Sequence, residues 1–160
     1  MGMHHVATCI PDRHTTVKSI RARLYSTHSP SPKPVTARYR ENRGRPKDRF
    51  VFAADILSNP RRQPYIHDIT LSIHYRGTLY KFLVFFKKHK MLPPNQSIQN
   101  LGGRHIDGDV LLVACGKRVS IRNLRSGLED RVADIAIRRL SESLDPIRIW
   151  RRFPASISFE

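Results

Sequence analysis

Alternating apolar and polar positions mark the clearest strand of the chain, between residues 68 and 76. One side of this strand is apolar and consists of Ile69, Leu71, Ile73 and Tyr75. Period-two alternation of this kind is typical of a strand with one buried face. Gly77 marks a turn, and residues 78–86, rich in aromatic and β-branched side chains, predict the partner strand. The pattern therefore predicts a β-hairpin.

A second pair of strands is predicted further along the chain. Residues 110–115 are a continuous apolar run of strand length, and Gly116 with Lys117 has the composition of a turn. In residues 118–124, Val119 and Ile121 alternate with polar positions and are expected to face the core. These features predict a second hairpin.

The strongest helix pattern follows this hairpin. Ser126 and Glu129 have the spacing of a capping box, and Asp134 and Arg138 have that of a supportive i,i+4 ion pair. The helix is expected to bury Leu128, Val132, Ile135, Ala136 and Leu140, and to expose Arg131, Asp134, Arg138 and Arg139. Asp145-Pro146 is expected to end it.

The N-terminal part has a different pattern. Residues 1–49 are predicted to form a mobile basic arm, in which residues 26–34 have the composition of a proline-rich linker. Within the arm, residues 15–24 place Val17, Ile20 and Leu24 at helical spacing, which is compatible with a short basic amphipathic helix. Residues 50–57 fit a short helix or a strand equally well.

Together these patterns predict an α+β fold, with a small antiparallel sheet of two hairpins packed by a C-terminal helix and a disordered basic N-terminal arm. The expected organisation is an arm and linker at residues 1–49 and a compact domain at residues 50–160, which ends in a basic and aromatic tail. No internal repeat is convincing.

The charge of the chain narrows its function. The 160 residues include 29 Lys and Arg against 13 Asp and Glu, which gives a formal net charge of +16. Such an excess opposes compaction by self-repulsion, and it favours a polyanionic partner. Nucleic acid is the first candidate, because each neutralised phosphate releases counterions. The abundance of Arg favours forked contacts to phosphates and base edges.

The sharpest local motif is Arg43-Gly44-Arg45-Pro46-Lys47, which resembles the AT-hook, a DNA-binding element centred on Arg-Gly-Arg-Pro. The resemblance implies that the two arginines enter the narrow minor groove of A·T-rich DNA and that Lys47 contacts a phosphate. Asn42 and Asp48 depart from the usual flanking residues. A chance match in an Arg-rich chain is the alternative interpretation.

Other basic residues extend the predicted nucleic-acid interface. They are Arg38, Arg40, Lys87, Lys88, Arg151 and Arg152. Aromatic residues accompany some of them: Tyr80, Phe82, Phe85 and Phe86 around Lys81 and Lys87, and Trp150 and Phe153 around Arg151 and Arg152. Both groups are candidates for base stacking, and core packing is the alternative for each.

A second resemblance concerns targeting. Arg23-Leu24-Tyr25-Ser26 is similar to the cleavage site of mitochondrial presequences, and the residues before it are rich in Arg, Ser and Thr. The alternative is a basic arm that is retained. If the arm is retained, we expect a nuclear protein. The mitochondrion is the alternative location.

Catalytic chemistry is not expected. The His and carboxylate clusters are His67-Asp68, His74, His105 and Asp107-Gly108-Asp109, and a metal-dependent phosphodiesterase would need several such groups to converge on cations. However, Asp107-Gly108-Asp109 fits a turn before the next strand, and His67 and His74 differ in parity along theirs. The sequence also contains no phosphate-binding loop and no zinc-spaced Cys/His set. Cys9 and Cys115 lie in different settings, so we expect no disulfide framework. We also expect no catalytic residue, metal site or cofactor, and no membrane segment.

The resulting hypothesis is a non-enzymatic nucleic-acid-binding protein, with DNA weakly favoured over RNA and a protein partner possible. The first alternative is a structural component embedded in the RNA of a ribonucleoprotein, such as a mitochondrial ribosome. The second is a basic protein-interaction domain.

Overall fold

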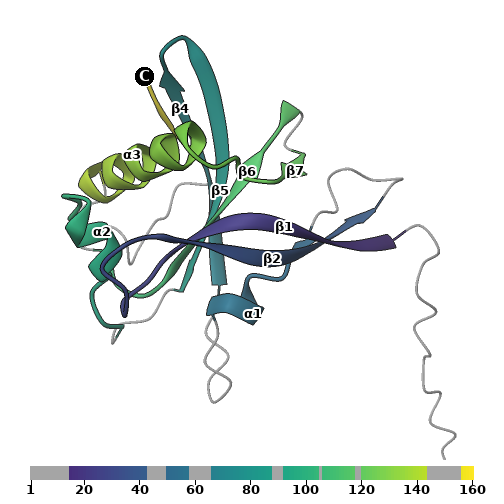
Figure 1. Cartoon of the computed structure of the whole chain (residues 1–160), viewed down its shortest axis with the longest axis horizontal. Helices are drawn as coiled ribbons and strands as arrows, with labels where there is room; N and C mark the ends of the chain where they lie inside the picture. The colour runs from purple at the N-terminus through teal and green to yellow at the C-terminus, as the bar shows by residue number, and fades with distance from the viewer. Residues whose placement is uncertain are drawn as a thin grey trace, which may run out of the picture.

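The computed structural model describes residues 15–42, 50–57, 66–87, 92–104, 106–117, 120–143 and 156–160. These residues form eight strands and three helices (Figure 1). The strands are β1 (Thr15–Tyr25), β2 (Lys33–Asn42), β3 (Phe50–Val51), β4 (Ile66–Tyr75), β5 (Thr78–Lys87), β6 (Val110–Cys115), β7 (Ile121–Arg122) and β8 (Ser156–Phe159). The helices are α1 (Ala54–Leu57), α2 (Gln96–Asn100) and α3 (Leu128–Ser143).

All eight strands belong to one curled sheet, in the order β3-β2-β1-β6-β5-β4-β8, with β7 attached to the end of β6. Neighbouring strands are antiparallel except β4 and β8, which are parallel. The sheet twists so strongly that the β1–β2 hairpin crosses the β4–β5 hairpin at a steep angle, which gives a half-barrel (Figure 1). The predicted fold of two small hairpins, one helix and a disordered arm is therefore wrong, because most of the described structure is a single large mixed sheet.

The continuous apolar run at residues 110–115 is explained by the central place of β6. Val110, Leu112 and Ala114 face a core that is covered by α3 and α2, whereas Leu111 and Val113 face a second core that is closed by α1. A strand that is buried on both faces loses its alternation and becomes apolar throughout. This strand was predicted correctly, and it joins the two cores.

The β4–β5 hairpin agrees with its prediction. Ile69, Leu71 and Ile73 are buried in the α3-side core, and the ladder runs from Ile66↔Lys87 to Tyr75↔Thr78. The two-residue turn between the strands contains Arg76 (φ 49°) and Gly77 (φ 78°). Positive φ at both central positions is the geometry that matches the twist of a tight hairpin.

The prediction of a disordered arm is wrong for residues 15–42. β1 pairs with β2 over ten residue pairs and with β6 over three, so it lies inside the sheet. The short helix predicted for residues 15–24 is also wrong, since these residues form β1. Ile20, Ala22 and Leu24 alternate along β1 and pack in the α1-side core.

The segment between β1 and β2, predicted to be a proline-rich linker, is held by side chains of the α2 region. Ser97 Oγ accepts from the Ser26 backbone N–H (3.1 Å) and donates to the Ser29 carbonyl (2.7 Å). Asn100 donates to the Pro30 carbonyl (2.8 Å), and Asp109 accepts from the Thr27 N–H (2.8 Å). These bonds fix the loop to the body of the fold.

The second hairpin and the helix differ in detail from their predictions. β7 covers only Ile121–Arg122, and it pairs with Ala114 and Cys115 at the end of β6. Helix α3 begins at Leu128, and Glu129, expected in a capping box, instead accepts from Arg122 Nη1 at 2.6 Å. The predicted pairing of Asp134 with Arg138 is replaced by contacts to β1, which are described below.

Residues 50–57 contain both of the elements between which the sequence did not decide. Phe50–Val51 is a short strand, and Ala54–Leu57 is a one-turn helix that buries Leu57 against the α1-side core. Within the part of the chain that the structure describes, no helix is both long enough and apolar enough to cross a membrane.

Candidate nucleic-acid interface

The alternation of β2 separates buried side chains from exposed arginines. Ala37 and Tyr39 are buried in the α1-side core. Arg38 and Arg40 therefore point to the opposite, outward face, where both are exposed. Two of the predicted interface residues thus lie side by side on a rigid strand.

The next strand places aromatic rings beside these arginines. Arg40 is paired with Phe50 in the β2–β3 register, and its guanidinium carbon lies 5.9 Å from the centre of the Phe50 ring. The guanidinium carbon of Arg38 lies 5.2 Å from the centre of the Phe52 ring. The two rings meet edge to face, with their centroids 5.1 Å apart. Both distances are within the range of cation–π attraction, which orients each guanidinium without neutralising it.

A third strand extends this surface. Val17 of β1 is paired with Arg40, so Val17, Arg40 and Phe50 form a row across three neighbouring strands. Val17 is 56% exposed and Phe50 is 52% exposed, which is unusual for large apolar residues. We call the set Val17, Arg38, Arg40, Phe50 and Phe52 the β2–β3 surface.

The two arginines of the β2–β3 surface differ in their charge balance. Arg38 donates to Asp55 Oδ2 from Nη2 at 2.6 Å and from Nε at 3.1 Å. Arg40 has no carboxylate partner among the residues that the structure describes. Within these residues, the charge of Arg40 is not balanced by a carboxylate.

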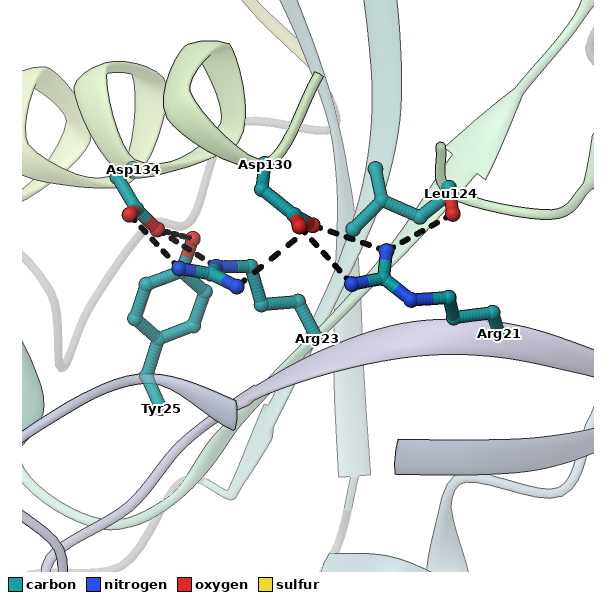
Figure 2. Close-up of polar contacts among 6 residues, drawn as sticks. All are labelled: Arg21, Arg23, Tyr25, Leu124, Asp130 and Asp134. Carbon is teal, nitrogen blue, oxygen red and sulfur yellow. Dashed lines mark hydrogen bonds and ion pairs between the residues drawn. The ribbon is translucent and has the colours of Figure 1, made fainter. Parts of the chain in front are cut away.

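Arginines on the neighbouring strand β1 pair with carboxylates of helix α3 (Figure 2). Arg21 donates to both oxygens of Asp130, at 3.0 and 2.9 Å, and to the Leu124 carbonyl at 2.9 Å. Arg23 donates to both oxygens of Asp134, at 2.7 and 2.8 Å, and its Nη1 lies 3.6 Å from Asp130. We call these four side chains, together with Tyr25, the β1–α3 network.

Tyr25 completes the network from the core. Its ring is fully buried, and its hydroxyl donates to Asp134 Oδ1 at 2.8 Å. Burial, reinforced by the Asp134 carboxylate, holds the pKa of Tyr25 well above its ordinary value. Partial burial by itself would raise the pKa of Asp130, but the hydrogen bonds from Arg21 and the charge of Arg23 outweigh it and lower that pKa.

The network binds α3 to the sheet, and its two carboxylates are largely shielded from solvent, with 17% and 21% of their side-chain surface exposed. Both carboxylates accept bidentate bonds from arginine, which is the strongest geometry for this pair. The hydrogen bonds to Asp130 raise the pKa of Arg21, and those to Asp134 raise the pKa of Arg23 against its partial burial. Neither carboxylate can act as a base without breaking these bonds, so the arrangement is structural.

The other predicted interface residues are not brought onto the β2–β3 surface. Lys87 lies at the end of β5, paired with Ile66, and β1 and β6 separate β5 from β2 in the sheet. Arg43, Gly44, Arg45, Pro46, Lys47, Lys88, Arg151 and Arg152 lie outside the described residues, as do Trp150 and Phe153.

The aromatic residues of β5 belong mainly to the core. Phe82 and Phe86 are buried in the α3-side core, and Phe85 packs against the α1-side core. The residues that sequence reasoning missed are Phe50, Phe52 and Val17. The alternation of Thr36, Arg38 and Arg40 with Val35, Ala37 and Tyr39 was a signal for the exposed face of β2, but no local pattern gave its register with β3.

The described His and Asp groups considered for catalysis lie on separate elements or have structural partners, and His105 lies outside the described residues. His67 stacks on Phe86, with the ring centroids 6.0 Å apart, and Asp109 accepts from the Thr27 backbone. Across the described ranges, no three His, Cys, Asp or Glu side chains are placed to share a metal ion. Asp68 borders a hollow of about 230 Å³ whose lining is otherwise mainly apolar and includes Phe50, Ile66 and Phe85.

Comparisons with protein-family models, with curated proteins and with solved structures found no match to this chain, so its interface is interpreted from its own geometry.

Proposed function

We propose that this protein binds nucleic acid without catalysing a reaction, and that the β2–β3 surface is part of the binding interface. The observation that supports the proposal is the row of Val17, Arg40 and Phe50, in which an exposed arginine lies between two exposed apolar side chains and has no carboxylate partner among the described residues. Cations beside exposed rings suit a ligand with phosphates and flat bases.

The distribution of charge supports the same proposal. Glu129, Asp130 and Asp134 of α3 and Asp55 of α1 pair with arginines of the fold itself. In the segments outside the described residues, the acidic residues are Asp12, Asp48 and Asp145. The basic residues there are Arg13, Arg43, Arg45, Lys47, Arg49, Arg61, Arg62, Lys88, Lys90, Arg118, Arg148, Arg151 and Arg152. Most of the net charge of +16 therefore lies in these segments of the sequence.

The AT-hook-like segment is adjacent to the β2–β3 surface in the chain. Residues 43–49 connect Asn42, at the end of β2, to Phe50, at the start of β3. A ligand held by Arg40 and Phe50 is thus within reach of Arg43 and Arg45. We propose duplex DNA rich in A·T as the favoured ligand of this segment, because its narrow minor groove attracts arginine.

The test is fluorescence anisotropy of the full chain with labelled A·T-rich duplex, G·C-rich duplex, single-stranded DNA and an RNA hairpin, over a range of salt. The double variant Arg40→Gln with Phe50→Ala should lower affinity about tenfold, and loss of the Arg40 charge should reduce the log–log salt slope by about one. The matched control is Arg104→Gln with Leu79→Ala, which removes an exposed arginine and an exposed apolar side chain elsewhere.

A third variant tests the segment itself. Replacing both Arg43 and Arg45 with Ala should abolish the preference for A·T over G·C duplex, at about 1–3 kcal/mol for each lost base-edge contact. Equal loss from the control double variant, or affinity that is insensitive to salt, would show that nucleic-acid binding does not use this surface. A preference for the RNA hairpin would favour the ribonucleoprotein alternative.

A further inference from the structure

A second exposed apolar site lies at the far end of β6. The ladder between β5 and β6 ends at the pair Lys81↔Cys115, whereas β5 begins three residues earlier, at Thr78. Residues 78–80 therefore pair with β4 on one side, and no described strand pairs with them on the other. Among the described residues, this leaves a short strand edge without a backbone partner.

A hollow of about 410 Å³ lies beside this free edge, between the start of β5 and the junction of β7 with α3. Leu79, which is 45% exposed, borders it from β5, and Leu128, which is 47% exposed, borders it from the first residue of α3. Single exposed apolar residues are common on protein surfaces and need no explanation. Exposed apolar residues that gather at one hollow are, by contrast, typical of interaction sites.

The charged groups of the hollow favour an acidic occupant. Glu129 is buried and accepts from Arg122 at 2.6 Å, so these two charges compensate each other. Arg125, also in the lining, is exposed and has no carboxylate partner within the described part of the chain. The net charge of +16 adds a long-range attraction for anionic partners.

We propose that this hollow binds an extended acidic peptide segment of a partner protein, in which apolar side chains alternate with carboxylates. The backbone of the peptide would add to the free edge at residues 78–80, as in β-strand addition. An apolar side chain would pack between Leu79 and Leu128, and the neighbouring carboxylate would pair with Arg125. This site is separate from the β2–β3 surface, and it does not depend on the nucleic-acid proposal.

The experiment uses the full ¹⁵N-labelled chain and the synthetic peptide Leu-Glu-Leu-Glu-Leu-Glu, with affinity measured by anisotropy of a labelled copy and contacts mapped by amide chemical shifts. We expect saturable binding, with the largest shifts at residues 78–80 and 122–129. The same peptide with Ser in place of Leu should bind at least tenfold more weakly, and so should the peptide with Lys in place of Glu.

Variants separate the site from general charge attraction. Arg125→Glu should weaken binding at least tenfold, and Leu128→Ser at least fivefold, while the matched controls Arg104→Glu and Val17→Ser stay within twofold of the wild type. All four side chains are exposed, so the fold is retained, which the unfolding midpoint in urea verifies.

Equal binding of the Ser-containing peptide, equal losses from the control variants, or shifts centred on residues 38–40 and 50 would overturn the proposal. Absence of saturable binding at millimolar peptide would also overturn it.

Discussion

Two neighbouring strands of this sheet present arginines in opposite ways. On β1, Arg23 has a side chain that is 12% exposed, and it binds two aspartates of α3. On β2, Arg38 has a side chain that is 57% exposed and pairs with Asp55 at the molecular surface, and Arg40 has no carboxylate partner in the described ranges. The residue type is the same, and the strands are adjacent.

The difference between β1 and β2 comes from what covers them. Helix α3 lies over the end of β1 and supplies Asp130 and Asp134. Among the described residues, the outward face of β2 is bordered instead by the rings of Phe50 and Phe52 and by one exposed carboxylate, that of Asp55. A guanidinium can hold a fold together or meet a ligand, and the supply of local carboxylates decides which. A count of arginines therefore overstates the charge available for binding.

The largest effect is expected when the contributions of Arg23 and Arg38 to the free energy of unfolding are compared. Arg23→Gln should lower the free energy of unfolding by about 2–4 kcal/mol, because it leaves two partly buried carboxylates with fewer donors. Arg38→Gln, which breaks an exposed pair of the same type, should lower it by no more than about 0.5 kcal/mol. Urea unfolding of both variants at neutral pH measures the difference. Losses of equal size would mean that burial by α3 does not distinguish the two arginines.

The stability that the β1–α3 network contributes should depend on pH through Asp130. An unfolded Asp titrates near pH 4, and the hydrogen bonds from Arg21 and the charge of Arg23 hold the pKa of Asp130 below that value against its partial burial. The stability that Asp130 contributes is therefore complete above about pH 5, and it is lost as pH falls below 4 through the folded-state pKa.

Asp130→Asn should thus be less stable than the wild type at pH 7, by about 2–3 kcal/mol, and the gap should narrow as the pH falls from 5 to 3. Urea midpoints across this range measure it, with Asp55→Asn as the exposed control whose gap stays small throughout. A gap for Asp130→Asn that stays constant with pH would contradict the assigned ionisation.

The smallest expected effect concerns the buried end of the network. Tyr25→Phe removes one hydrogen bond to Asp134, which keeps its two bonds from Arg23, so the cost at pH 7 should be about 0.5–1.5 kcal/mol. Because burial raises the pKa of Tyr25, the folded state favours the neutral phenol, and the wild type should lose stability as pH rises above about 10. The variant should lose less over the same range, as followed by circular dichroism. An identical alkaline loss in both proteins would assign it to other groups.

How far the sequence predicts this fold depends on the distance between paired elements. The β4–β5 hairpin follows from alternation around a two-residue turn, and the pattern showed it. β1 was assigned wrongly because Val17, Ile20 and Leu24 also fit a helical period, and the small Ala22 hid the alternation. The partner of Arg21 lies 109 residues later in the chain, so no local pattern links them.

The candidate interface was predictable to a similar extent. Charge alone pointed to Arg38 and Arg40, which were expected in a mobile arm, and their aromatic neighbours depend on the register of a two-residue strand, Phe50–Val51. Asp134 was expected on the wet face of its helix, and it is the curl of the sheet that brings β1 against that face. Curvature is a property of the whole sheet, and short sequence windows do not contain it.

The position of β1 between β2 and β6 has a consequence for biosynthesis. The β1–β2 hairpin leaves the ribosome before β6, and the core around Ile20, Ala22 and Leu24 is complete only when Leu111 and Val113 of β6 arrive. At a synthesis rate of about 5–20 residues per second, the interval between Asn42 and Val110 lasts several seconds. During that time the nascent hairpin presents an apolar face and unpaired strand edges, so its yield in the cell should depend on holding chaperones more than on the final stability of the fold.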